Sequence, residues 1–140
     1  MNIEFYDIGT VMNNKLKFAV ISAYYQGQWL YVRQRNRHSW EIPGGHRESC
    51  EEIDKTAKRE LFEETGCKEM DLTPICDYSM DDTFKKVFGR LYFARIKGMG
   101  RLPVSEIAEV KLFKDLPTYL TYPEIQPILH EKTLAFLKEF

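Results

Sequence analysis

The chain has 140 residues, of which 44% are hydrophobic and 14% aromatic, so it is long and apolar enough for one domain with a buried core. A net charge of −1 argues against bulk electrostatic attraction to nucleic acid or to an anionic membrane. Three cysteines without a C-x-x-C spacing predict neither a disulfide framework nor a zinc site, and they favour a cytoplasmic setting. Because no run approaches about 18 apolar residues and the first ten lack a secretion signal, we expect residues 1–140 to form a single domain without a membrane contact.

The first predicted elements form a hairpin. Residues 18–25 are an apolar run, residues 26–28 contain a glycine turn, and residues 29–35 alternate in the manner of a half-buried strand. The chain then reaches the Gly44–Gly45 pair. This pair predicts a tight turn with positive φ, a place where the backbone approaches a ligand closely, or both.

A basic stretch lies between the hairpin and these glycines. Its candidate substrate-binding residues are Arg33, Arg35 and Arg37, because a guanidinium can bind a phosphate through two hydrogen bonds. Arg33 and Arg35 share strand parity and form the better pair. A solvated basic loop is the alternative interpretation.

The next element is a predicted helix that begins near Cys50 and ends at Gly66. Ser49 and Glu52 have the S-x-x-E spacing of a capping box. Glycine is the residue that most often follows the last turn of a helix, so Gly66 marks its end.

Three glutamates, Glu60, Glu63 and Glu64, share one face of this helix at the i, i+3, i+4 spacing. Like charges at this spacing repel one another, and the helix dipole disfavours anions in the last turns. A divalent cation would remove the repulsion, since Mg²⁺ and Mn²⁺ bind carboxylate oxygens. The alternative is a solvated acidic helix.

The remaining elements are two strands, a short strand and a closing helix. Residues 72–80 and 86–96 are predicted as strands joined across Asp81-Asp82-Thr83, followed by a strand at 109–113 and a helix at 122–140. The residues expected to point inward from that helix are Ile125, Ile128, Leu129 and Leu137. This order of strands and helices predicts an α/β fold with helices packed on a mixed sheet.

The acidic helix is part of a longer pattern, G-x5-E-x7-R-E-(apolar)-x-E-E-x-G, that spans residues 45–66. The matching residues are Gly45, Glu51, Arg59, Glu60, Leu61, Glu63, Glu64 and Gly66. On this pattern, and on the preceding WEIPGG of residues 40–45, the chain resembles the Nudix hydrolases, with Cys67 where a bulky aliphatic residue is usual. The resemblance implies a Nudix-type α/β/α sandwich with a mixed β-sheet. Beyond residues 29–67 it rests only on the order of elements.

The resemblance also implies roles for individual residues. Metal ligands would be the carbonyl of Gly45 and the carboxylates of Glu60, Glu63 and Glu64, with Mg²⁺ or Mn²⁺ as the ion. Arg59 would orient these glutamates, and Glu60 is either a ligand or the catalytic base. A late glutamate reaches the metals or acts as base in some members, and Glu109 is the first candidate here, with Glu106 as its competitor.

The expected activity is metal-dependent hydrolysis of a phosphoanhydride bond in a nucleoside triphosphate, giving monophosphate and pyrophosphate. An oxidised purine nucleotide is one candidate substrate, since WEIPGG looks like the lead-in of oxidised-guanine triphosphatases; Gln126 stands in place of their purine-reading asparagine. Alternatives are an RNA 5′ end, a nucleotide sugar, or a non-catalytic nucleotide-sensing module. The sequence leaves monomer and homodimer open. Aromatic residues that could stack on a base are Tyr78, Phe84, Tyr119 and Tyr122.

Overall fold

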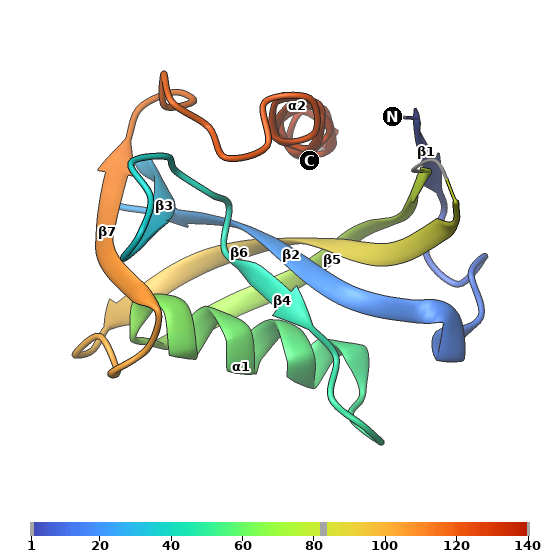
Figure 1. The fold of residues 1–140 in the computed structure, drawn as a ribbon, viewed down its shortest axis with the longest axis horizontal. Helices are drawn as coiled ribbons and strands as arrows, with labels where there is room; N and C mark the ends of the chain where they lie inside the picture. Colours follow the sequence, from blue (N-terminus) through green and yellow to red (C-terminus); the bar gives the residue numbers. More distant parts are fainter. Residues whose placement is uncertain (1, 82–83, 140) are drawn as a thin grey trace.

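The computed structural model describes residues 2–81 and 84–139, in which seven strands form one mixed sheet of order β1-β5-β6-β2-β3-β7, with β4 paired to β2. The strands are β1 (Asn2–Tyr6), β2 (Leu16–Tyr25), β3 (Gln28–Gln34), β4 (Gly44–His46), β5 (Cys67–Asp81), β6 (Lys86–Met99) and β7 (Ile107–Phe113). The helices are η1 (Asn13–Lys15), α1 (Ile53–Thr65) and α2 (Gln126–Leu137). Helix α1 lies on one face of the sheet and α2 on the other (Figure 1), which confirms the predicted α/β/α sandwich.

The five predicted strands are confirmed as β2, β3, β5, β6 and β7, and β1 and β4 were not predicted. Strand β4 holds two glycines, which have low β propensity, and it exists because β2 pairs with it from Phe18 to Val20. Asp82 and Thr83, in the predicted connection, lie outside the described residues, as does Phe140 at the predicted end of the closing helix. No helix in residues 2–81 and 84–139 is long and apolar enough to cross a membrane.

Two local predictions around α1 are wrong. Gly44 and Gly45 form no positive-φ turn, because both lie in the extended strand β4 and neither has a positive φ. The helix starts at Ile53 rather than near Cys50, whose φ of 63° is not helical, and Glu52 occupies the N-cap without a side-chain hydrogen bond. The end of the helix is confirmed: Gly66 is left-handed, with φ of 80°.

The closing helix also differs from its prediction. It begins at Gln126, because Pro127 is suited to the first turn and the preceding residues form a turn instead. Ile128 does not point inward, since 41% of it is exposed. Leu129 is buried, and Ile125 and Leu137 pack against apolar clusters on the α2 face, as predicted.

The core on the α1 face fixes the helix that carries the acidic residues. Ala57 and Leu61 are fully buried and pack against Leu16, Ala19 and other residues of the sheet. Burying a leucine side chain stabilises a fold by about 1.5–3 kcal/mol. The glutamates beside this stripe are therefore held against the edge of the sheet at β4.

A buried ion pair ties β5 to β6. Nε of Arg90 lies 2.6 Å from Oδ1 of Asp77, whose side chain is fully buried. Asp77→Asn would leave the guanidinium without its counter-charge, so we expect the free energy of unfolding to fall by about 3 kcal/mol. Chemical denaturation measures this change. Asp71→Asn, which breaks the exposed Lys97–Asp71 pair, is the matched control and should cost less than about 1 kcal/mol; equal losses would contradict the assignment.

Candidate metal centre

Arg59 stands in the middle of the acidic residues of α1 and the loop before it. Its Nη1 lies 2.8 Å from Oε1 of Glu60 and 3.4 Å from Oε2 of Glu63. Its Nε lies 2.7 Å from Oε2 of Glu51, and its Nη2 donates to the carbonyl oxygen of His46 at 2.9 Å. One guanidinium therefore links the helix to β4 and to the loop between them.

Glu51 anchors this arginine. Besides Arg59, its carboxylate accepts hydrogen bonds from the Thr56 hydroxyl at 2.6 Å and from the Glu48 backbone N–H at 3.1 Å. The hydrogen bonds from Arg59 and Thr56 lower the pKa of Glu51 to about 2. Glu51 is thus an ionised carboxylate that holds Arg59 in place, and the role of Thr56 in this contact was not predicted from the sequence.

Glu64 is the most buried member of the carboxylate cluster, by which we mean Glu60, Glu63 and Glu64. Its Oε1 accepts a hydrogen bond of 2.8 Å from the backbone N–H of Gly44, and only 7% of the residue is exposed. Burial raises the pKa of Glu64 to about 8 against the effect of that hydrogen bond. Burial also raises the pKa of Glu60. Two carboxylates so placed are stabilised in their ionised form by a nearby cation.

Gly45 packs directly against this cluster. A Cβ added at Gly45 would lie 2.3 Å from Cδ of Glu60, so only glycine lets the two groups come so close. Among the described residues, no three acidic, His or Cys side chains already converge as a closed metal site, and Arg59 lies among the carboxylates. The donors nonetheless fit a hard divalent cation, since they are carboxylate oxygens beside a backbone segment without side chains. The residues that could hold it are Gly45, Glu60, Glu63 and Glu64.

The two glycines of β4 make a matched pair of variants. In Gly45→Ala the atoms nearest to the new methyl are those of the Glu60 carboxylate, so we expect a normal melting temperature but loss of most activity, by about tenfold or more, because that carboxylate must move. In Gly44→Ala the methyl meets the backbone oxygen of Ala19 at 2.5 Å, so the pairing of β4 with β2 should weaken. Thermal denaturation and steady-state kinetics separate the two effects. Full activity in Gly45→Ala would contradict the placement of Glu60.

The two late glutamates lie differently. Glu109 forms an ion pair with Arg33, with 3.2 Å between Oε1 and Nη2, and it pairs with Arg33 across β7 and β3. Glu106 lies just before β7, and its charge contributes to the raised pKa values of both Glu60 and Glu64. Of the two late glutamates, Glu106 is therefore the one whose charge acts on the carboxylate cluster.

The three arginines of the basic stretch have partners within the chain. Nε and Nη2 of Arg33 donate to Glu109, and Nη1 donates to the carbonyl oxygen of Arg37, so each nitrogen of the guanidinium makes a hydrogen bond. Nη1 of Arg37 lies 3.0 Å from Oε2 of Glu41, so this arginine is also in an ion pair. Arg35 donates through Nε to the Ser105 carbonyl oxygen, and no residue of 2–81 or 84–139 accepts a hydrogen bond from its two Nη groups, which could therefore bind an anion.

Gln126 is held by backbone groups. Its Oε1 accepts a hydrogen bond from the N–H of Tyr122 at 2.8 Å, and its Nε2 donates to the carbonyl oxygen of Trp40 at 3.3 Å. The residue is buried, so it serves to attach α2 to the segment before β4. Among the proposed stacking residues, Tyr78 is buried, whereas Phe84, Tyr119 and Tyr122 are exposed.

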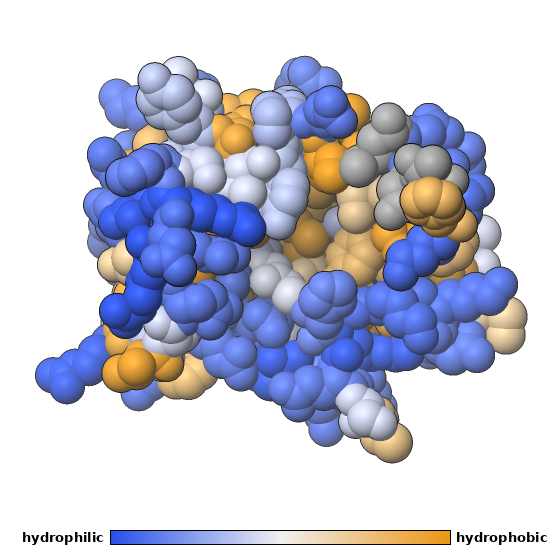
Figure 2. All heavy atoms as spheres, in the orientation of Figure 1, coloured by the Kyte–Doolittle hydropathy of each residue, from blue (hydrophilic) through white to orange (hydrophobic). Residues whose placement is uncertain are grey.

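An apolar hollow opens on the same face of the molecule as β4. Figure 2 shows it between α2 and the β1 edge of the sheet. The apolar cluster on this side includes an aromatic row in which Phe18 lies between Tyr78, at 5.6 Å, and His46, at 6.2 Å, measured between ring centroids. Phe18 and Tyr78 are buried, so these two rings belong to the core of the α2 face and offer no open surface for stacking on a base.

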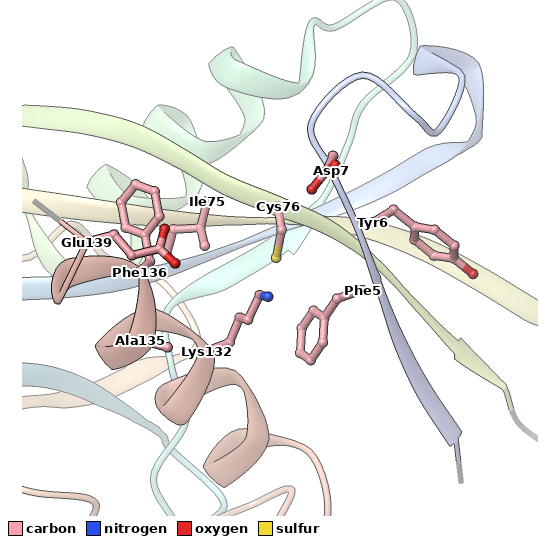
Figure 3. A pocket seen from close by; sticks show the side chains of 9 residues that line it. All are labelled: Phe5, Tyr6, Asp7, Ile75, Cys76, Lys132, Ala135, Phe136 and Glu139. Atoms are coloured by element: carbon pink, nitrogen blue, oxygen red, sulfur yellow. The ribbon is translucent and has the colours of Figure 1, made fainter.

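A cavity of about 250 Å³ lies between β1, β5 and α2 (Figure 3). Lys132 places its Nζ 5.0 Å from the ring centroid of Phe5, and Cys76 points toward it from β5. Burial raises the pKa of Cys76 to about 11, so its thiol is protonated near neutral pH. This cavity therefore offers no activated nucleophile from Cys76.

Comparison with protein families gives one match that covers most of the chain: the model described as "NUDIX domain" matches residues 15–135. A curated relative, "Putative 8-oxo-dGTP diphosphatase YtkD" of Bacillus subtilis (strain 168), is 32% identical over 98 residues. The matched segment is 68% of this chain, and the chain spans about 60% of the length of that relative.

Solved structures share the fold at lower identity. The Bacillus subtilis pyrophosphohydrolase BsRppH has a TM-score of 0.80 at 22% identity, over 95% of this chain and 90% of that one. The NUDIX domain of Shewanella oneidensis NrtR, complexed with ADP ribose, has a TM-score of 0.68 at 19% identity, over 94% of each chain. The architecture of sheet and helices is thus common to a pyrophosphohydrolase and to a NUDIX domain solved with bound ADP ribose.

Proposed function

This chain belongs to the Nudix family, and on that premise we propose that it hydrolyses a phosphoanhydride bond of a nucleoside triphosphate, releasing monophosphate and pyrophosphate. The observation that carries the proposal is the packing of Gly45 against Glu60 at the carboxylate cluster. The similarity to YtkD supports an oxidised purine nucleotide as the substrate.

When bound at Gly45, Glu60, Glu63 and Glu64, Mg²⁺ or Mn²⁺ would neutralise phosphate charge and lower the pKa of a water. Arg59 holds Glu60 and Glu63 on the side of the helix that faces β4. An ionised carboxylate with access to solvent is needed to take the proton of the attacking water. We assign this role to Glu106, which is exposed and whose charge acts on Glu60 and Glu64.

Glu106→Gln and Glu109→Gln test this assignment as a matched pair. We expect Glu106→Gln to lower kcat about 10- to 100-fold, because the amide cannot accept a proton. Glu109→Gln should change kcat less than about threefold, since Glu109 is paired with Arg33. Steady-state kinetics at saturating substrate measures both. The reverse order of effects would return the role to Glu109.

An RNA 5′ end is the second candidate substrate. It is favoured by the two Nη groups of Arg35, which could bind phosphate, and by the position of this arginine, whose backbone N–H donates to the Glu106 carbonyl oxygen. An additional phosphate-binding arginine would suit a polyphosphorylated strand. Arg33 and Arg37 remain weaker proposals for substrate contact, because ion pairs already engage them.

The deciding experiment offers the purified protein canonical and oxidised nucleoside triphosphates, nucleotide sugars and triphosphorylated RNA in the presence of Mg²⁺, and identifies the products. We expect monophosphate and pyrophosphate from an oxidised purine triphosphate, and no product from the Glu63→Gln variant. Hydrolysis of RNA alone would select the second candidate. Binding of nucleotides without any hydrolysis would instead indicate a sensing module.

A further inference from the structure

Strand β7 forms an open edge of the sheet. It pairs with β3 from Trp29 to Gln34, and within the described residues no other strand adjoins it. Figure 1 shows β7 at the margin of the sheet, at the end opposite β1. The backbone groups on its outer side are therefore free to pair with another strand.

An apolar groove of about 460 Å³ runs along this edge on the α1 face. Its lining includes Leu30, Met99 and Leu102 together with Ala108, Val110 and Leu112 of β7. Ala108 is exposed, and Val110 and Leu112 are only partly buried. A strand added beside β7 would cover these side chains with its own.

Glu109 and Lys111 also border the groove, but they alternate with its apolar residues along β7, and their charged ends contact groups of the opposite face. Glu109 contacts Arg33, and Nζ of Lys111 lies 5.4 Å from the ring centroid of Phe113, which belongs to the cluster on the α2 face. Both hydrogen bonds from Arg33 to Glu109 go to Oε1, and among the described residues none donates to Oε2, which is left for a second cation. The strand thus has an apolar side and a side with one acid and one base.

These features make β7 complementary to itself. In an antiparallel pair related by a two-fold axis perpendicular to the sheet, each residue keeps its face, so opposed residues have the same parity. An axis at Val110 places Glu109 opposite Lys111 of the second copy, twice, and Ala108 opposite Leu112. An axis at Glu109 or at Lys111 would instead oppose two like charges, which is destabilising.

We propose that the protein forms a two-fold homodimer through antiparallel pairing of β7 with β7 of a second copy, centred on Val110. The other edge does not suit such pairing, because an axis at the middle of β1 would oppose two Glu4 side chains. Pairing β7 with β1 would give an open chain of molecules, whereas β7 with β7 closes after two. The carboxylate cluster at β4 and α1 is not part of this surface.

Charge reversal provides the test. In Lys111→Glu both positions of the edge are acidic, and in Glu109→Lys both are basic, so we expect each variant to sediment as a monomer of 16.6 kDa. The wild-type protein should sediment at twice that mass, and an equimolar mixture of the two variants should recover the dimer. Lys97→Glu, an exposed change on β6, is the control and should leave the dimer intact.

A monomeric wild-type protein, or single variants that dimerise as the wild type does, would overturn the proposal. Because Glu109→Lys also removes the partner of Arg33, a second variant guards against misfolding. Val110→Cys in a Cys50→Ser background should form an intermolecular disulfide under oxidised glutathione, since Cα atoms opposed across a strand pair lie about 4.5–5.5 Å apart. Leu112→Cys, which faces Ala108 in the proposed register, should not; equal cross-linking of both would reject the register.

Discussion

Glu64→Gln should abolish catalysis without weakening the fold. The variant amide can still accept the hydrogen bond from Gly44 through its oxygen, so the packing under β4 is preserved. It cannot supply an anionic oxygen to a metal ion, and we expect kcat to fall by two orders of magnitude or more, which is about 3 kcal/mol of transition-state stabilisation. Steady-state kinetics with Mg²⁺ and the substrate found in the panel measures this loss. Activity within about tenfold of wild type would contradict the assignment of Glu64 as a ligand.

The same variant has a consequence for stability in the presence of a chelator. Burial raises the pKa of Glu64 in the fold to about 8, above its ordinary value near 4.5, so the folded protein binds this proton more tightly than the unfolded chain does. The stability it contributes is present below the unfolded pKa and is lost as the pH rises through about 8. Metal-free wild type should therefore lose stability between pH 5 and pH 8 relative to Glu64→Gln, as measured by chemical denaturation.

Arg59→Ala should have the second largest effect on activity. Removal of the guanidinium frees Glu60 and Glu63 from their positions and leaves Glu51 without its main partner. Substitution of a residue that orients metal ligands typically lowers activity about 10–100-fold. Because Arg59 contacts two of the candidate ligands, Glu60 and Glu63, we expect a loss of about 100-fold in kcat/KM. Kinetics at several Mg²⁺ concentrations would show whether excess metal restores part of the rate.

Arg59→Lys distinguishes geometry from charge. The lysine keeps the positive charge but has no planar fork, so it cannot hold Glu51, Glu60 and the His46 carbonyl at once. We expect it to lose at least tenfold in kcat/KM. Lys58→Ala, the exposed neighbour on the same helix, is the control and should be near wild type. Equal activity of Arg59→Lys and wild type would show that charge alone suffices.

The predictions from sequence succeeded where the determining contacts are local. The spacing of the glutamates placed them on one face of α1, and Gly66 ended the helix as expected, because both features depend on residues within one or two turns. The predicted start of the helix was wrong because Cys50 has a φ of 63°, outside the helical region, and Glu52 rather than Ser49 occupies the N-cap.

Contacts between distant segments could not be predicted in the same way. The hydrogen bond from Gly44 to Glu64 and the approach of Gly45 to Glu60 exist only because β4 pairs with β2, and β4 has no strand-forming sequence of its own. The choice between Glu106 and Glu109 likewise depends on where β7 begins. Sequence spacing alone left that choice open.

We infer that the carboxylate cluster binds a divalent metal ion that is used in hydrolysis. The most direct measurement is a calorimetric titration of Mg²⁺ and of Mn²⁺ into the wild-type protein and into Glu64→Gln, each checked for folding by its melting temperature. We predict saturable binding to the wild type and its loss in the folded variant. Equal binding to both proteins, or no binding to the wild type with or without nucleotide, would contradict the claim.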